Sequence, residues 1–350
     1  MHNLNVAIIG TGFGKRVLLP CLEYASGIRV KYLVSRDNKG NDLQDISVIK
    51  FSDLLLDDEI DLVCIATPPF THYEKVLELV KYNKNILCEK PFALNVMQCN
   101  QIVKASKDKK LLMALNHQLR FHKNFQKINE IIKNNMLGVV RHVQINYLSS
   151  TCFDSNRQWS WWMNLAKGGG QVNALGSHFI DLLQWWFGKI INVNANLHTF
   201  NKTRLSSSGK SKEVTSDEYA SINIEFESGE VGHILTSSVV NDDICFQLKI
   251  IGSKKTLELT KDDKLLVLSL DTQVEDLTEV DPLLDEPIIG INRWRRSMVR
   301  YAIHIRDVIK NNEQFKGSTF EDGLEVQRVL DAVHLSNKEH RIVAINEIKM

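Results

Sequence analysis

The first third of the chain alternates short apolar runs with stretches that repeat apolar residues at helical spacing. The apolar runs predict buried parallel strands at residues 4–9, 29–35, 61–66, 85–88 and 111–115. Helical spacing lies between them, at residues 15–24, 73–82 and 97–107. Strands that alternate with helices in this way predict a doubly wound parallel sheet of the Rossmann type.

Beyond residue 120 the pattern becomes that of a mostly antiparallel sheet accompanied by helices. Residues 139–148 alternate apolar and polar side chains, and residues 190–270 hold strand-like segments separated by turn signals at 227–230 and 252–253. Helical spacing marks residues 121–135, 179–187, 293–310 and 320–336, and the Ser- and Lys-rich residues 202–212 predict a mobile loop. We therefore expect an α/β Rossmann domain (1–120) and an α+β domain with an open, mostly antiparallel sheet (121–350). The final helices could pack back on the first domain.

Composition narrows the class of protein. The 350 residues include 43 Lys and Arg against 42 Asp and Glu, so a net charge of +1 offers no field for nucleic acid or a membrane surface. No apolar stretch reaches the ~20 residues that span a bilayer, and no leader-like segment begins the chain. The six cysteines contain no C-x-x-C pair, so neither a disulfide framework nor a metal site is expected. These features predict a cytoplasmic globular protein.

A glycine-rich turn follows the first predicted strand directly. It reads Gly10-Thr11-Gly12-Phe13-Gly14, with Lys15 where the dinucleotide fingerprint G-x-G-x-x-G has its third glycine. Gly10 would permit the tight turn, and Gly12 would let the backbone approach a pyrophosphate at the helix N-terminus. The turn predicts a dinucleotide site despite the displaced glycine.

The residue that meets the adenosine ribose follows the second strand of such folds. Here that position holds Ser35-Arg36 rather than an acidic side chain. A guanidinium suits a 2′-phosphate, whereas a carboxylate would accept from the 2′-hydroxyl and repel a phosphate. The pair favours NADP(H), and NAD(H) remains the alternative because Asp37 lies one residue further.

Two more predicted strands end in polar motifs at the same, carboxyl, edge of the sheet. One is followed by Thr67-Pro68, with His72 four residues later, and the other by Glu89-Lys90-Pro91. Ligands of doubly wound sheets bind at this edge, so we expect these side chains to line the cofactor site. Each has a structural alternative, since His72 could cap and pack a helix and Lys90 could form a surface ion pair.

These motifs together resemble the glucose–fructose oxidoreductase/inositol dehydrogenase (Gfo/Idh/MocA) family. The motifs that carry the resemblance stand in this order: Gly10-x-Gly12, Thr67-Pro-x-x-x-His72, Glu89-Lys90-Pro91, Asn116-x-x-x-Arg120-Phe121 and Gly168-Gly-Gly…Gly176-x-His178-x-x-Asp181. The resemblance implies hydride transfer between nicotinamide and a carbinol carbon of a sugar or cyclitol. It also implies that Lys90 bonds the reacting oxygen, that His178 is a second acid/base, and that Asn116 belongs to the cofactor site. A homodimer or homotetramer would form through the C-terminal sheet.

One position departs from the family's pattern. The common motif D-x-G-x-H has an aspartate four residues before the histidine, where this chain has Ala174. The neighbouring Asn173 offers an amide but no charge, so we expect Lys90 and His178 to share the proton chemistry without that carboxylate. Some branches of the family also carry alanine there.

The expected substrate is a sugar, a polyol or a nucleotide-linked sugar. The residues predicted to contact it, with Lys90 and His178, are Arg120, Trp162 and Asn173. Trp162 could instead fill an interface, and His178 could be a buried structural histidine. Two alternative functions remain open from sequence: a cofactor-binding metabolite sensor without turnover, and a redox-cycling glycosidase whose cofactor stays bound.

Overall fold

The computed structural model describes residues 3–35, 46–241, 245–270, 274–287, 289 and 292–350. The chain forms two compact units, each described here by itself. The first unit comprises Met1–Ala93, Met97–Lys123 and Asp281–Leu324. The second comprises Leu94–Val96, Asn124–Val280 and Glu325–Met350.

A seven-stranded sheet of order β17-β6-β5-β4-β1-β2-β3 forms the centre of the first unit. Its strands are β1 Leu4–Ile9, β2 Ile28–Val34, β3 Ser47–Ile49, β4 Leu62–Ile65, β5 Ile86–Cys88, β6 Met113–Leu115 and β17 Ser318–Thr319. All neighbouring pairs are parallel except β17 with β6. The predicted doubly wound parallel sheet is therefore confirmed.

Helices from distant parts of the sequence cover the sheet of the first unit. They are α1 Leu19–Tyr24, α2 Phe51–Leu55, α3 His72–Lys81, α4 Val96–Ser106 and α7 Arg293–Asn311. One core cluster joins β1, through Leu4, Val6 and Ile8, to buried side chains of α1 and α7 such as Tyr301. The hydroxyl of Tyr301 donates to the carbonyl of Leu115 at 2.9 Å, which fixes α7 to the end of β6.

The second unit contains a nine-stranded sheet of order β16-β15-β14-β13-β7-β12-β11-β8-β18. Its strands are β7 Val140–Leu148, β8 Ile190–His198, β11 Tyr219–Phe226, β12 Val231–Ser237, β13 Cys245–Gly252, β14 Thr256–Leu259, β15 Leu265–Leu268, β16 Val274–Asp276 and β18 Val343–Ala344. Only β7 and β12 pair in parallel, so the mostly antiparallel sheet predicted from the alternating pattern is confirmed.

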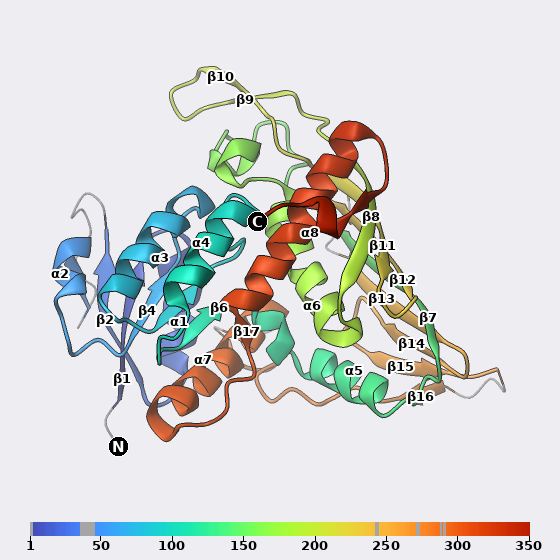
Figure 1. The fold of residues 1–350 in the computed structure, drawn as a ribbon, viewed down its shortest axis with the longest axis horizontal. Helices are drawn as coiled ribbons and strands as arrows, with labels where there is room; N and C mark the ends of the chain where they lie inside the picture. Colours follow the sequence, from blue (N-terminus) through green and yellow to red (C-terminus); the bar gives the residue numbers. More distant parts are fainter. Residues whose placement is uncertain (1–2, 36–45, 242–244, 271–273, 288, 290–291) are drawn as a thin grey trace. The chain divides into compact units, whose positions relative to one another are not determined.

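One face of this sheet is covered and the other is open. Helices α5 Lys123–Lys133 and α6 Ser177–Phe187 lie on the covered face (Figure 1). Phe125 of α5 and Phe179 of α6 both contact Phe246 of β13, with ring centroids 5.8 and 5.7 Å apart. Along β7 the side chains of Val143 and Ile145 are buried on this face, as the predicted alternation requires.

The structure corrects one local prediction. Residues 202–212, predicted as a mobile loop, contain strands β9 Thr203–Leu205 and β10 Ser211–Glu213, which pair as an antiparallel hairpin. Arg204 fixes the base of the hairpin, because its buried guanidinium donates to the Cys152 carbonyl at 2.6 Å and lies 3.4 Å from the Glu218 carboxylate. Serine and lysine content indicated polarity, but the long-range partners of Arg204 decide the order of the segment.

Candidate active site

The glycine turn after β1 has the geometry that a dinucleotide site requires. Gly10 has φ +114°, and a Cβ there would lie 2.6 Å from the carbonyl oxygen of Ala66, so only glycine fits. A Cβ on Gly12 would meet nothing within 4 Å, which leaves its backbone open to a ligand. The side chains of Thr11, Phe13 and Lys15 around it are exposed.

Gly14 performs the packing role of the displaced third glycine. A Cβ on Gly14 would lie 2.7 Å from Cγ2 of Ile8, so glycine allows the helical segment to approach β1 closely. The segment begins with a π-helical turn, Gly14–Leu18, before α1. Ser35 follows β2 and is half-buried, whereas Arg36 lies outside the described residues.

His72 is an internal support of the cofactor edge. Its imidazole is fully buried, with Nε2 2.8 Å from the Thr67 carbonyl and Nδ1 3.1 Å from the Pro91 carbonyl. Burial lowers the pKa of His72, so the ring is neutral and donates to one of the two carbonyls at a time. The geometry gives His72 the task of joining the turn after β4 to the turn after β5. Its direct contact with a cofactor stays a prediction.

Glu89, Lys90 and Asn116 converge at the carboxyl ends of β5 and β6. The Glu89 carboxylate is 7% exposed and accepts from Nδ2 of Asn116 at 2.5 Å. The Asn116 backbone in turn donates to the Cys88 carbonyl at 2.8 Å. In the described part of the chain, Oδ1 of Asn116 is buried and has no hydrogen-bond partner. An orphaned acceptor beside the predicted site fits a ligand hydroxyl such as that of a ribose.

The electrostatics of Lys90 suit proton transfer. Burial lowers the pKa of its ammonium, and the neighbouring Glu89 carboxylate opposes that shift. Burial likewise raises the pKa of Glu89, against the stabilising effects of Lys90 and of the Asn116 hydrogen bond. Lys90 therefore loses its proton more readily than an exposed lysine, although the Glu89 carboxylate opposes that loss.

Arg120 has partners within its own unit. Its guanidinium is buried and lies 3.2 Å from the Asp322 carboxylate, with a longer contact of 3.4 Å to the Gly317 carbonyl. The Arg120 side chain thereby ties the 3₁₀ turn Gln118–Phe121 to the start of α8 Phe320–Glu339. Its contact with substrate stays a prediction.

In the second unit, His178 and Asn173 lie on one continuous helical segment. A π-helical turn, Val172–Gly176, runs into α6, where His178 is 2% exposed. The Asn173 amide donates to the Gly169 carbonyl at 3.0 Å, and its Oδ1 lies 3.2 Å from Nε2 of His334. Burial lowers the pKa of His334 to about 4, so this ring is neutral and donates to Asn173. Asn173 is thus held on both sides, next to Ala174.

Trp162 lies in a turn that is held by Ser216, from a segment that the sequence did not mark as functional. The Arg157 guanidinium lies over the Trp162 ring, 5.4 Å from its centroid. The Trp162 carbonyl accepts from the Ser216 hydroxyl at 3.1 Å and from the Gly170 amide at 3.1 Å. Ser216 and its neighbours were not among the residues predicted from sequence, because no local motif marks them and only tertiary contacts reveal them.

Two further properties of the described residues bear on the chemistry. No group of three or more His, Cys, Asp or Glu side chains among them is arranged to hold a metal ion. None of the helices they form is long and apolar enough to cross a membrane.

Two family models match nearly the whole chain. Residues 4–117 match the NAD-binding Rossmann fold of the Gfo/Idh/MocA oxidoreductase family, and residues 129–345 match the family's C-terminal alpha/beta domain. An uncharacterized oxidoreductase of Synechocystis is 31% identical over 363 residues, which cover 99% of this chain and 97% of the relative. The glucose-6-phosphate 3-dehydrogenase of Bacillus subtilis is 24% identical over 80% of this chain and 79% of its own.

Solved structures share the fold at lower identity. Levoglucosan dehydrogenase in complex with NADH and L-sorbose superimposes with a TM-score of 0.87, at 21% identity, over 99% of both chains. This likeness supports the same two-part architecture of a Rossmann sheet and a mostly antiparallel sheet.

The Glu89–Lys90 pair yields the first prediction. In a Glu89→Gln variant, the amide oxygen can still accept from Asn116, but the anion that stabilises the ammonium is gone. The pKa of Lys90 should therefore fall further. The measurement is a pH titration of the ¹³C-dimethylated lysines by NMR, with the Lys90 resonance assigned from its loss in Lys90→Arg. The exposed Glu78→Gln serves as control, and an unchanged or higher Lys90 pKa would contradict the assignment.

Proposed function

Because the chain belongs to the Gfo/Idh/MocA oxidoreductase family, we propose that it transfers a hydride between nicotinamide and the carbinol or keto carbon of a sugar, cyclitol or nucleotide-linked sugar. The observation that carries the proposal is the position of the half-buried Lys90 at the carboxyl edge of the sheet, next to the buried Glu89 carboxylate. Burial lowers the pKa of Lys90, and Glu89 opposes that shift. Relatives named for sugar oxidation, such as glucose-6-phosphate 3-dehydrogenase, support the substrate class.

The described residues fit a nicotinamide dinucleotide, which supplies the hydride acceptor or donor when bound. The open backbone at Gly12 and the positive φ of Gly10 suit a pyrophosphate. The orphaned Oδ1 of Asn116 suits a ribose hydroxyl. Thr67 and Pro68 form the neighbouring turn, where the Thr67 hydroxyl lies 2.6 Å from that of Thr71.

Proton transfer falls to Lys90 and His178 in this proposal. Oxidation of an alcohol requires a base for the hydroxyl proton, and reduction of a ketone requires an acid for the forming alkoxide. A lysine whose pKa is lowered gives up its proton more readily than an exposed lysine, which favours its use as an acid or a base. His178 supplies a second titratable group from the helix of the second unit.

For the cofactor, we favour NADP(H) over NAD(H). The family model that matches residues 4–117 is described as an NAD-binding Rossmann fold. The preference rests on the sequence Ser35-Arg36 after β2, a hydroxyl and a guanidinium that suit a 2′-phosphate.

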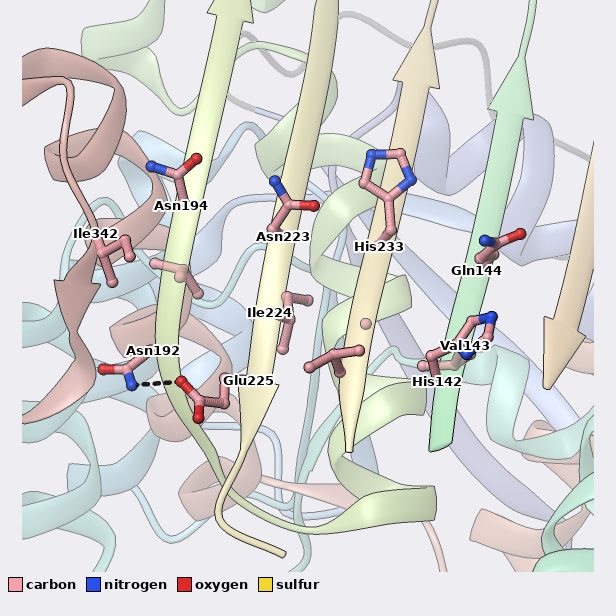
Figure 2. Close-up of a pocket in the computed structure, with 13 residues that line it drawn as sticks. His142, Val143, Gln144, Asn192, Asn194, Asn223, Ile224, Glu225, His233 and Ile342 are labelled. Atoms are coloured by element: carbon pink, nitrogen blue, oxygen red, sulfur yellow. Dashed lines mark hydrogen bonds between the residues drawn. The ribbon is translucent and has the colours of Figure 1, made fainter. Parts of the chain in front are cut away.

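We also propose that the open face of the nine-stranded sheet binds a second copy of the chain. Figure 2 shows a shallow pocket on this face whose central side chains are mostly amides and imidazoles: Asn194, Asn223, His233 and Gln144. Amides both donate and accept, which suits a face that must match itself across a twofold axis. Val231 and Ile342 at the same pocket are 51% and 64% exposed, and Glu225 is bonded to Asn192 at 2.8 Å. Few charges and exposed apolar side chains are features of an interface core.

Replacement of Lys90 by alanine tests the catalytic assignment. Loss of an acid/base should lower turnover at least ~100-fold, while NADH or NADPH still binds. Steady-state rates on a panel of sugars, polyols and nucleotide-sugars, combined with fluorescence titration of the dinucleotide, measure both effects. The exposed Lys110→Ala is the control. Turnover within a few-fold of wild type in the Lys90 variant would refute the role.

Arg36→Ala tests the cofactor preference. Removal of a guanidinium that pairs with a phosphate should weaken NADPH by roughly tenfold or more and leave NADH nearly unchanged. Dissociation constants of both dinucleotides give the comparison. Equal weakening of the two would show that Arg36 does not read the 2′-phosphate.

Val231→Arg tests the open sheet face. A guanidinium that becomes buried without a partner opposes association strongly, so the variant should sediment as a monomer where the wild type sediments as a dimer or tetramer. Val274→Arg places the same charge on the exposed edge strand β16 and should leave the mass unchanged. A monomeric wild type, or equal masses for wild type and Val231→Arg, would exclude this interface.

A further inference from the structure

Three consecutive residues before β11 hold together the parts of the second unit that carry the predicted substrate contacts. The Thr215 amide donates to the Met163 carbonyl at 3.0 Å, and its hydroxyl accepts from the Leu165 amide at 3.0 Å. Ser216 donates to the carbonyl of Trp162. These bonds fix the turn that carries the Trp162 ring.

Asp217 holds the other part, the start of the helical segment that carries Asn173 and His178. Its backbone carbonyl accepts from the Gln171 amide at 3.1 Å, and its Oδ2 accepts from the Val172 amide at 2.9 Å. Both amides belong to the first turn of a helix, where donors have no partner inside the helix. Asp217 therefore caps this helix from a distant part of the sequence.

The run Gly168-Gly169-Gly170 makes this approach sterically possible. A Cβ on Gly170, whose φ is +108°, would overlap Oδ1 of Asp217, and a Cβ on Gly169 would overlap the Trp162 carbonyl. Glycine is thus required on the sides that face the cap and the Trp162 turn. The glycine run 168–170 and residues 215–217 therefore pack directly against each other.

We propose that Asp217 is a positioning residue for the sugar-binding side of the site: by capping the segment at Gln171 and Val172, it sets the placement of Asn173 and His178. This inference rests on the proposed function. Asp217 is 5% exposed and touches backbone, so it acts through the helix rather than on the reacting atoms.

The charge state of Asp217 gives the cap a pH dependence of definite sign. Burial, with a smaller contribution from the Glu218 carboxylate, raises the pKa of this carboxyl to about 6 against the opposing hydrogen bonds. Other titratable side chains that line a cavity with Asp217 are Asp331, His334 and Lys338, and Glu218 is itself paired with Arg204. A folded-state pKa above the ordinary 3.8 means that the Asp217 carboxyl binds its proton more tightly when it caps the helix than when the cap is broken. The stability of the cap is therefore greatest below about pH 4 and falls as the pH rises toward 6.

Two variants separate the hydrogen bond from the charge. Asp217→Ala removes the acceptor for the Val172 amide, whereas Asp217→Asn keeps an oxygen in that position without a titratable group. We expect Asp217→Ala to raise the KM for the sugar substrate about tenfold and to leave the dinucleotide dissociation constant unchanged, and Asp217→Asn to restore most of the loss. The exposed Glu227→Gln, in the turn between β11 and β12, is the control.

Hydrogen exchange of the Gln171–Ser177 amides tests the cap without any substrate. After correction for the intrinsic exchange rate, protection at Val172 in the wild type should fall between about pH 4 and 6, and Asp217→Asn should show no such fall. This comparison needs neither turnover nor the alanine variant, so it judges the cap even if that variant does not fold or the proposed reaction is wrong. Equal pH dependence in wild type and Asp217→Asn, or equal KM values for the alanine variant and wild type, would overturn the inference.

Discussion

The buried carboxylate of Glu89 is the constraint on which the cofactor side of this protein depends. An ionised carboxylate out of water is costly unless hydrogen bonds and an opposite charge compensate it. Here the compensation comes from Nδ2 of Asn116, at the end of β6, and from Lys90. Burial lowers the pKa of Lys90, and the Glu89 carboxylate opposes that shift. The geometry of two neighbouring strand ends and part of the pKa shift of Lys90 therefore depend on the same carboxylate.

The second unit uses a buried carboxylate in a different way. Asp217 accepts from the backbone of Val172 and has no cation against it in the described contacts. Burial therefore raises its pKa to about 6, and the group fixes a helix start instead of tuning a neighbouring side chain. Glu218, the next residue, is by contrast paired with Arg204 and stabilises the base of the β9–β10 hairpin. The adjacent residues Asp217 and Glu218 therefore stabilise two segments that are distant in sequence: the helix start at Val172 and the β9–β10 hairpin.

Periodicity was sufficient to predict both sheets of the fold, and motif order was sufficient to predict the family. Both sheets and the glycine turn follow from local patterns, since parallel strands and helix starts have strong local signals. The predictions were weaker where a side chain's partner lies far away in sequence. The order of residues 202–212 depends on Arg204 and Glu218, and the support given by His72 depends on Pro91. No sequence motif marks Asp217, although the Gly168–Gly170 run indicates that another segment approaches the backbone closely there.

Ala174 stands where the family's usual pattern has an aspartate. In the family's usual pattern a carboxylate four residues before the histidine would sit on the same helix and share the proton chemistry. Here Asn173 cannot replace it, because its amide is committed to Gly169 and its oxygen to the neutral His334. The pKa of Lys90 is lowered by burial and raised by the Glu89 carboxylate, and both effects arise within the first unit. In the proposed reaction, the absence of a carboxylate at position 174 leaves the Glu89 carboxylate as the anion that acts on the pKa of Lys90.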